Sequence, residues 1–365
     1  MRAKGYVTAR QEFPVPFFDA RTARLSADDL ALPVIPQAIV VPTGADGMSG
    51  PLVTVAAHCA RGPLPADAIA VIDLPYRRWS SIHDGNILAT VRQAFASGAR
   101  AALLVTNGPT GEAIALNGDG DRPLFDRPLA VLAPRAFAQL RATGARRATL
   151  TIDGTAGTRA AFNLAGRIDR GVGRWLVVST PRSGWTIAAG ERGPGIAAWL
   201  ALSRWAAAAL PGLDLAFLCN SGHEYENLGA SRALGSLAPR PGQTAFWLHL
   251  GASLATRDWH DLGGGRLLPL PSADPQRFLL ASPPWVTAAR NAFAGIAGLE
   301  MAYPAGPGAP GELAGILAAR YQGVAGIFGA HRYHHTVEDD ARCVDASLVT
   351  PVVEACKRLI SRVLC

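Results

Sequence analysis

The stretch DLAFLCNSGHEYENLGASR, residues 214–232, contains the pattern from which the fold class follows. It begins with the apolar run DLAFLC (214–219), which is typical of a strand buried on both faces of a sheet. Two polar residues, His223 and Glu224, come shortly after that run, and a helical stretch follows them. A buried strand, a polar turn and a helix in this order predict one unit of an α/β fold.

The same unit recurs in the rest of the chain from about residue 160. The other predicted strands are AFNLAGRI (161–168), RWLVVS (174–179), TAFWLHL (244–250) and GVAGIFG (323–329). The predicted helices cover 193–210, the segment after Glu224, 282–296, 310–321 and 346–364. Strands that alternate with helices of this length predict a three-layer fold, with a mostly parallel sheet covered by helices on both faces.

A smaller block precedes this one. Residues 45–155 contain the predicted strands PLVTVAA (51–57), AIAVID (68–73), AALLV (101–105) and ATLTI (148–152), with a helix near 86–97 and a loop rich in Gly, Asp and Pro at 107–123. We find no convergent set of nucleophile, base and metal ligand here, and predict a strand-rich α/β lid or recognition module inserted in the chain. We expect domains at 1–44, 45–155 and 156–365, with the first segment packing on the last.

The composition limits the class of protein. Of the 365 residues, 49% are hydrophobic and 17% are charged, which suits a well-buried globular protein. The net charge of +7 comes almost wholly from arginines, since Lys4 and Lys357 are the only lysines. These arginines are scattered, whereas a nucleic-acid partner needs a concentrated basic patch, so we expect none. No apolar run is long enough to span a bilayer, and we expect no membrane association.

The cysteines and the first residues bear on location. Cys59, Cys219, Cys343, Cys356 and Cys365 form an odd set without a CxxC pair, which argues against a disulfide framework and a zinc finger. The opening MRAKGYVTARQEF has no apolar core typical of a secretory signal. We therefore expect a cytoplasmic protein with free thiols.

Polar residues follow several of the predicted strands. They are Thr180 after RWLVVS, His223 and Glu224 after DLAFLC, Gly251 after TAFWLHL, and His331 to His335 after GVAGIFG. In open α/β sheets the ligand crevice lies at the carboxyl ends of the strands. We therefore expect these loops to form one site.

Two carboxylates and one imidazole stand out as candidate metal ligands. Glu191, Glu224 and His335 are a normal set for an open zinc site that leaves one position for water, and Asp339 is placed to orient a ligating histidine. Other interpretations stay open. Glu224 fits a carboxylate in the first turn of a helix, and Glu191 fits an ion pair with Arg192 or Arg182. We interpret His331 and His334 as surface residues or as residues behind the ligands.

The order of motifs resembles the family of co-catalytic zinc aminopeptidases, which also contains the glutaminyl cyclases and the transferrin-receptor ectodomain. The matching segments are Asn163-Leu164-Ala165-Gly166, Ser179-Thr180-Pro181-Arg182-Ser183, Gly190-Glu191-Arg192-Gly193-Pro194-Gly195, Gly222-His223-Glu224 with Gly229-Ala230-Ser231, and His335-Thr336-Val337-Glu338-Asp339. The resemblance covers roughly residues 160–365. The first block is similar to the protease-associated insertion found in many members.

The resemblance implies a two-metal site of which half is lost. Glu191 falls at the bridging position, and Glu224 and His335 fall at the ligands of the second metal. The ligands of the first metal fall at Thr180 and near Gly251, which cannot bind zinc as the family's residues do. The resemblance therefore implies one zinc ion, held by Glu191, Glu224 and His335.

His223 falls at the position of the family's general base. An imidazole differs from a carboxylate in charge, reach and proton affinity, so His223 fits a base, an additional metal ligand or a hydrogen-bonded core histidine. His249, just before Gly251, is a further candidate for completing the site.

Two functions follow from the sequence. One is a mononuclear zinc hydrolase or acyl-transfer enzyme that acts on a peptide or aminoacyl small-molecule substrate, with His223 as the catalytic base. The other is an inactive pseudopeptidase that serves as a binding or structural module, in which Arg182 replaces the lost charge and pairs with Glu191. The sequence does not fix the oligomeric state.

Overall fold

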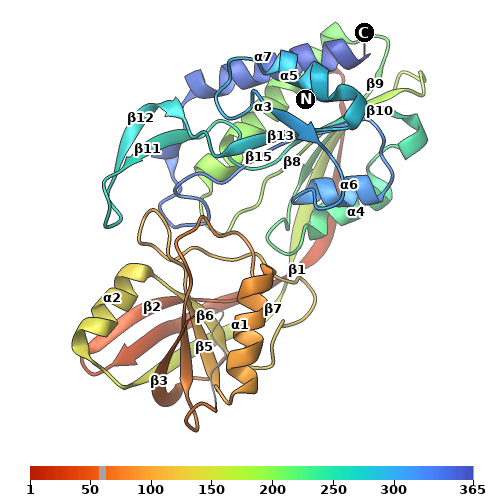
Figure 1. Cartoon of the computed structure of the whole chain (residues 1–365). Helices are drawn as coiled ribbons and strands as arrows, with labels where there is room; N and C mark the ends of the chain where they lie inside the picture. Colours follow the sequence, from red (N-terminus) through yellow and green to blue (C-terminus); the bar gives the residue numbers. More distant parts are fainter. Residues whose placement is uncertain (57–62, 365) are drawn as a thin grey trace.

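Two lobes are joined by a pair of very long antiparallel strands (Figure 1). The computed structural model describes residues 1–56 and 63–364. Strands β1 (Val7–Ala27) and β7 (Arg147–Ile168) pair along nearly their whole lengths, from Val7 opposite Arg167 to Ser26 opposite Thr149. Both strands therefore contribute to both lobes. We call the lobe formed by residues 30–146 the small lobe and the lobe formed by residues 169–364 the large lobe.

The large lobe is built on a sheet with a parallel centre. Its four central strands, in spatial order, are β9 (Asp214–Asn220), β8 (Trp175–Pro181), β10 (Thr244–Leu250) and β15 (Val324–Gly329). Antiparallel neighbours flank them, with β7 beside β9, and β13 (Arg277–Ala281) beside β15. The short strand β14 (Ala302–Pro304) forms the edge.

Helices cover both faces of this sheet. One face carries α3 (Ala189–Ala209), α5 (Val286–Ala292) and α7 (Ala346–Leu364), and the other carries α4 (Leu228–Ser236) and α6 (Glu312–Ala318). Successive side chains of a strand point to opposite faces. Leu176 and Val178 of β8 accordingly join the core with α3 and α7, whereas Trp175 and Val177 join the core with α6.

The small lobe contains a series of strands that closes on itself. The order is β1, β2 (Leu30–Pro36), β6 (Leu129–Leu132), β5 (Ala101–Val105), β4 (Ile69–Asp73), β3 (Met48–Ala56) and β7, and β7 pairs with β1 again. Helices α1 (Gly85–Ala96) and α2 (Pro134–Thr143) pack on these strands. Every side chain of β5 and β6 is buried, which explains their apolar sequences.

The remaining elements are short. A hairpin of β11 (Arg257–Asp261) and β12 (Leu267–Ala273) projects beside the small lobe, as Figure 1 shows. Short 3-10 helices lie at Arg2–Lys4, Pro241–Gln243, Pro283–Trp285 and Ala341–Cys343.

The structure confirms a mixed α/β fold with a large central sheet, and the predicted strands and helices fall within one to four residues of observed elements for most of the chain. One prediction was wrong, because the strands predicted at 148–152 and 161–168 are one strand, β7. The strands β11, β12 and β13 were not predicted. The strands β1 and β2 were not predicted. Most residues of β1 are exposed or half-buried, so its sequence lacks the apolar pattern of a buried strand.

Two observations bear on the predicted domain limits. The limit at 155/156 falls inside β7, and β2, from the expected N-terminal segment, pairs with β6 of the small lobe. The division into three domains therefore stays a prediction.

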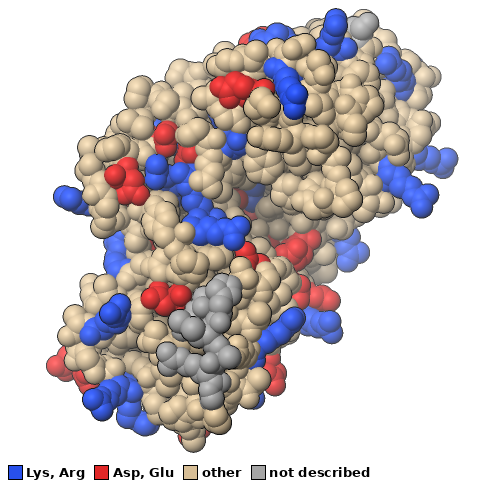
Figure 2. All heavy atoms as spheres, viewed as in Figure 1, with Lys and Arg blue, Asp and Glu red and all other residues tan. Residues whose placement is uncertain are grey.

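Among the predicted free thiols, Cys219, Cys343 and Cys356 are free and buried. Residue 57, Cys59 and Cys365 lie outside the described residues. In the described part of the chain no helix is both long and apolar enough to cross a membrane. Acidic and basic side chains are interspersed on the face drawn in Figure 2.

Candidate functional site

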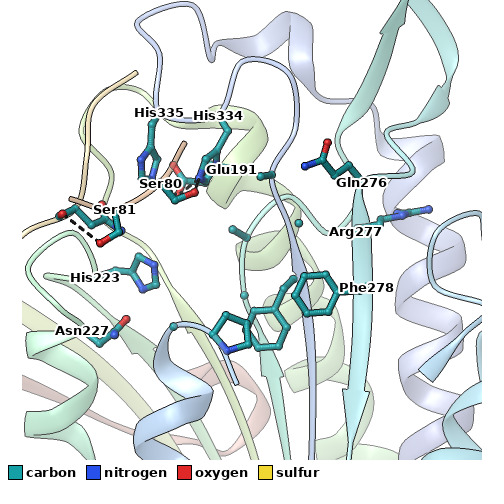
Figure 3. A pocket seen from close by; sticks show the side chains of 18 of the residues that line it. Ser80, Ser81, Glu191, His223, Asn227, Gln276, Arg277, Phe278, His334 and His335 are labelled. Atoms are coloured by element: carbon teal, nitrogen blue, oxygen red, sulfur yellow. Dashed lines mark hydrogen bonds and ion pairs between the residues drawn. The ribbon is translucent and has the colours of Figure 1, made fainter. Parts of the chain in front are cut away.

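A crevice of about 590 Å³ lies between the two lobes (Figures 2 and 3). The large lobe lines it with residues at the carboxyl ends of its parallel strands, among them Glu191, His223 and His249. The small lobe lines it with Ser80 and Asn117. The crevice has the size of an ordinary small-ligand site, and its position agrees with the strand ends nominated by the sequence.

The N-terminus of α3 is held by a buried carboxylate. Asp339 Oδ1 accepts a hydrogen bond from the backbone N–H of Gly190 at 2.6 Å, and Oδ2 accepts one from the N–H of Glu191 at 3.0 Å. An anion at this end of a helix binds the free N–H groups and opposes the helix dipole. A Cβ at residue 190 would lie 2.7 Å from Asp339 Oδ1, so this close approach requires glycine. Asp339 was predicted to orient a ligating histidine; it contacts His331 instead, at 3.2 Å.

A single arginine bridges the two predicted carboxylate ligands. Arg192 Nη2 lies 2.7 Å from Glu191 Oε1 and 3.2 Å from Glu224 Oε1, and its Nε donates to the Ser183 carbonyl at 2.7 Å. All three charged side chains are almost fully buried. Burial alone would raise the pKa of Glu191, but the charges of Arg192 and of the nearby histidines hold that pKa well below its usual range. Glu191 is therefore a carboxylate paired with a guanidinium.

Two stacked histidines complete this cluster. His335 Nε2 lies 3.2 Å from Glu191 Oε1, and His335 Nδ1 donates to the Ala115 carbonyl of the small lobe at 2.8 Å. Burial opposes the charged form of His335, yet its contact with Glu191 raises its pKa. The His334 ring stacks on His335 at 4.0 Å, and burial together with that neighbour lowers the pKa of His334 well below its usual value. His331 and His334 were interpreted as surface residues or as residues behind the ligands, and their burial excludes only the surface interpretation.

The predicted zinc ligands are only partly brought together. Glu191 and His335 are in contact, whereas Glu191 and Glu224 are linked by ion pairs with Arg192. Atoms of Glu191, His334 and His335 lie within 4.8 Å of one another, but the two rings are nearly parallel, with 18° between their planes. The in-plane lone pairs of stacked imidazoles do not converge on one point. In this arrangement the residues do not fit a metal ion, because a guanidinium already occupies the space between the carboxylates.

A second group of metal-binding residue types lies behind the first. Atoms of His331, Asp339 and Cys343 also come within 4.8 Å of one another. Both oxygens of Asp339 are already used by the N-terminus of α3, and burial raises the pKa of the Cys343 thiol. A thiol that keeps its proton is a poor ligand, so this group also does not fit a metal ion.

Arg182 does not take the role that the sequence suggested. Its Nε donates to Ser221 Oγ at 3.0 Å, its Nη2 donates to the Phe162 carbonyl at 3.3 Å, and its guanidinium lies 4.0 Å from the centre of the Phe162 ring. The positive charge between the carboxylates belongs to Arg192, and the alternative pairing of Glu191 with Arg192 is the one observed.

Thr180 and Gly251, the two positions at which the resemblance implied lost metal ligands, serve the packing. Thr180 Oγ1 donates to the Leu250 carbonyl at 2.9 Å, which ties β8 to β10. A Cβ at Gly251 would lie 2.6 Å from the Ile327 carbonyl oxygen, so no ligating side chain fits there without movement of β15.

A further buried carboxylate, Glu312, was not predicted. It is the first residue of α6, with Oε1 3.6 Å from His223 Nδ1 and Oε2 3.9 Å from His249 Nδ1. Burial would raise the pKa of Glu312, but the nearby histidines and a hydrogen bond from Asn220 Nδ2 hold it below its usual value. Burial lowers the pKa of His249 to about 4, and its Nδ1 lies 2.9 Å from Ser179 Oγ. The sequence signal was an acidic residue opening an apolar helix, which equally suits a carboxylate favoured by the helix dipole.

The small lobe also contributes more than the sequence suggested. Ser80 Oγ lies 3.1 Å from His334 Nε2, across the crevice between the lobes. The sequence contained no motif that marks Ser80, because its partner is 254 residues away along the chain.

The parallel-centred sheet with helices on both faces is an α/β fold, and several solved aminopeptidases share it. The zinc aminopeptidase BSAP from Bacillus subtilis matches 99% of this chain over 86% of its own length, with 15% identity and a TM-score of 0.73. The aminopeptidase from Aneurinibacillus sp. strain AM-1 matches 99% of this chain over 85% of its own, with 14% identity and a TM-score of 0.65. The peptidase M28 precursor from Shewanella amazonensis SB2B matches 98% over 84%, with 14% identity and a TM-score of 0.68.

At these identities the likeness establishes the fold alone, and it supports the predicted mixed α/β fold with a large central sheet and helices. The predicted inserted domain stays a prediction. No protein-family model matches the sequence. No curated protein matches it either.

Proposed function

We propose that this chain is a metal-independent protein on a zinc-aminopeptidase fold, and that its crevice binds a peptide or aminoacyl ligand. The observation that supports the proposal is the contact of one guanidinium, that of Arg192, with both Glu191 and Glu224. The ligand class follows from the fold, since the similar structures are aminopeptidases.

Electrostatics explain why Arg192 opposes zinc. Zinc binds carboxylate oxygens at about 2 Å. Arg192 Nη2 is already 2.7 Å from Glu191 Oε1, so a zinc ion on that oxygen would lie within about 5 Å of a buried guanidinium nitrogen. Two positive charges at that separation in a buried site repel strongly. The arginine also compensates the carboxylates by itself, so the site has less need of a metal ion.

The second candidate is the mononuclear zinc hydrolase implied by the sequence, with Glu191, Glu224 and His335 on the metal and His223 as base. One observation favours it. His335 donates its Nδ1 proton to a backbone carbonyl, which leaves Nε2 facing Glu191, the usual arrangement behind a ligating histidine. This candidate requires that the Arg192 side chain leave its present position.

Zinc content separates the two candidates. We would purify the chain without chelator, dialyse it against zinc, remove free metal, and measure zinc per chain by elemental analysis. We expect a negligible amount of zinc and no hydrolysis of leucine p-nitroanilide or of a peptide with N-terminal glutamine. About one zinc ion per chain, lost in both Glu224→Ala and His335→Ala, would refute the proposal and support the hydrolase.

We further propose that residues 45–155 act as the recognition module of this crevice, in the manner of a protease-associated insertion. The contributions of Ser80 and Asn117 to the crevice wall support this. The cytoplasmic location stays a prediction.

A further inference from the structure

A second pocket, separate from the crevice, lies against the strands that join the lobes. Its volume is about 430 Å³. Its lining comes from four places: residues 15–19 of β1, 159–162 of β7, 182–185 after β8, and 221, 222, 224 and 225 after β9. Among the described residues it shares no lining residue with the crevice. The turn after β9 contributes to both cavities, because His223 lines the crevice whereas Glu224 lines the second pocket.

Arg182 brings an unpaired positive charge to the second pocket. Its Nε and Nη2 donate to Ser221 Oγ and to the Phe162 carbonyl, and its guanidinium lies over the Phe162 ring. These hydrogen bonds use two of the five N–H donors of a guanidinium, and neither acceptor is charged. In the described part of the chain Arg182 has no carboxylate partner. A guanidinium binds a carboxylate through paired hydrogen bonds, so the free donors favour a ligand with a carboxylate group.

A negative charge lies in the same lining. The side chain of Glu224 is 6% exposed, and Arg192 contacts one of its two oxygens, Oε1, at 3.2 Å. The Arg192 guanidinium is shared with Glu191, so one positive charge faces two carboxylates there. Glu224 would repel a ligand that carries only a carboxylate. A ligand that carries an ammonium group beside its carboxylate is complementary to both Glu224 and Arg182.

Aromatic rings supply the apolar part of the pocket. The rings of Trp185 and Tyr225 meet edge to face, with 5.6 Å between their centres. Both residues, together with Phe17 and Phe18, also line an adjoining apolar hollow of about 210 Å³. A ligand held at Arg182 can therefore bury an apolar or aromatic side chain against these rings.

We propose that the second pocket binds a free amino acid with an apolar or aromatic side chain. The carboxylate of the amino acid pairs with Arg182, its ammonium group lies toward Glu224, and its side chain packs against the aromatic rings. The two charged groups of a free amino acid are attached to the same carbon atom, which suits two side chains of opposite charge in one small pocket.

This site goes beyond the proposed function, which concerns the crevice alone. The alternative for Arg182 is a purely structural role, in which its hydrogen bonds only tie the turn after β9 to β7. A structural role predicts no difference between compounds with and without a carboxylate group, so the two interpretations are separated by the choice of ligand.

Calorimetric titration with three related compounds tests the site. L-phenylalanine carries both charged groups, 2-phenylethylamine lacks the carboxylate, and 3-phenylpropanoate lacks the ammonium group. We expect phenylalanine to bind to the wild-type protein. Each of the other two compounds should bind about ten- to a hundredfold more weakly, the usual effect of losing a hydrogen bond to a charged group.

Three variants locate the bound phenylalanine. Arg182→Gln should weaken its binding by about ten- to a hundredfold but leave the binding of 2-phenylethylamine unchanged, because that compound has no carboxylate to lose. Ala160→Trp keeps Arg182 and fills the pocket from β7, where residue 160 is exposed, so it should abolish binding. Arg10→Gln is the matched control, since the Arg10 guanidinium also lies over the Phe162 ring, at 3.7 Å, but does not line the pocket. It should bind phenylalanine as the wild type does.

Thermal unfolding shows which variants are folded, and peptide binding to the crevice is measured on the same samples. Absence of phenylalanine binding to the folded wild-type protein overturns the inference. If Arg182→Gln weakens the binding of phenylalanine and 2-phenylethylamine equally, the guanidinium does not bind the carboxylate and the inference is wrong. Equal binding of 3-phenylpropanoate and phenylalanine overturns it as well, because Glu224 then plays no part.

The fate of the proposed function is read separately. If phenylalanine binds to folded Arg182→Gln and Ala160→Trp as tightly as to the wild type, it lies outside the second pocket, and this inference fails while peptide binding can still support the proposed function. If no peptide binds but phenylalanine responds to the variants as expected, the proposed function fails and the amino-acid site stands.

Discussion

On the proposed function the wild-type chain binds no zinc, and replacing Arg192 by alanine should allow it to bind zinc. The guanidinium forms ion pairs with both Glu191 and Glu224, and His335 lies beside Glu191. Without it, two buried carboxylates lose their positive partner and one imidazole nitrogen remains next to them. Two carboxylates and an imidazole form a normal open zinc site.

The size of the effect follows from burial. Arg192 is 3% exposed and Glu191 is 1% exposed, so solvent offers little compensation when the pair is broken. Breaking a buried ion pair from one side costs about 3–5 kcal/mol. The free energy of unfolding of Arg192→Ala should fall by about that amount without metal. Zinc at a hundred times its dissociation constant should restore about 2.7 kcal/mol.

The assay is urea unfolding with and without zinc, combined with zinc analysis per chain. Arg182→Ala is the matched control, because Arg182 contacts Ser221 and Phe162 rather than the two carboxylates. It should neither bind zinc nor gain stability from it. If Arg192→Ala is as stable as the wild type, or if zinc leaves its unfolding unchanged, then Arg192 is not the charge that replaces the metal.

Three other predictions concern groups that hold the site and its scaffold. Burial lowers the pKa of His249 to about 4. Between a pH of about 6.5 and about 4, the His249 imidazole is therefore protonated in the unfolded chain but not in the folded one. The free energy of unfolding should fall by about 3 kcal/mol as the pH drops through that range. His249→Asn should show a correspondingly flatter pH dependence of its unfolding free energy. Asp339→Asn should cost about 2 kcal/mol, since it loses the charged acceptor of the Gly190 N–H and the N-terminus of α3; an unchanged urea midpoint would contradict this. Arg170→Ala should cost about 2 kcal/mol, because the Arg170 guanidinium donates to three backbone carbonyls at and just beyond the end of α3, and thermal unfolding beside wild type checks it.

Local sequence patterns were sufficient to predict the strand–turn–helix units of the large lobe. Every residue of the run DLAFLC is buried in β9, and His223, which follows it, lines the crevice. Such a unit depends on the faces of one strand and one helix, which the period of the sequence shows directly. The long strand β1 escaped detection because few of its residues are buried.

The residue types at the site could also be anticipated from the sequence, but their partners could not. Neighbours in a helix point about 100° apart, so the adjacency of Glu191 and Arg192 did not predict their contact over a contact with Arg182. The tertiary structure selects Arg192, because the end of β8 directs Arg182 onto Phe162.

The sequence by itself determined the strand–turn–helix units, the α/β class and the acidic and imidazole groups available to the site. Only the tertiary structure decided which cation lies between the carboxylates, that Glu312 lies beneath His223, and that Ser80 meets His334. The physical reason is the range of the interactions. Periodicity records which face of an element is buried, whereas a contact between residues 254 positions apart exists only after the strands have paired and the two lobes have closed on one crevice.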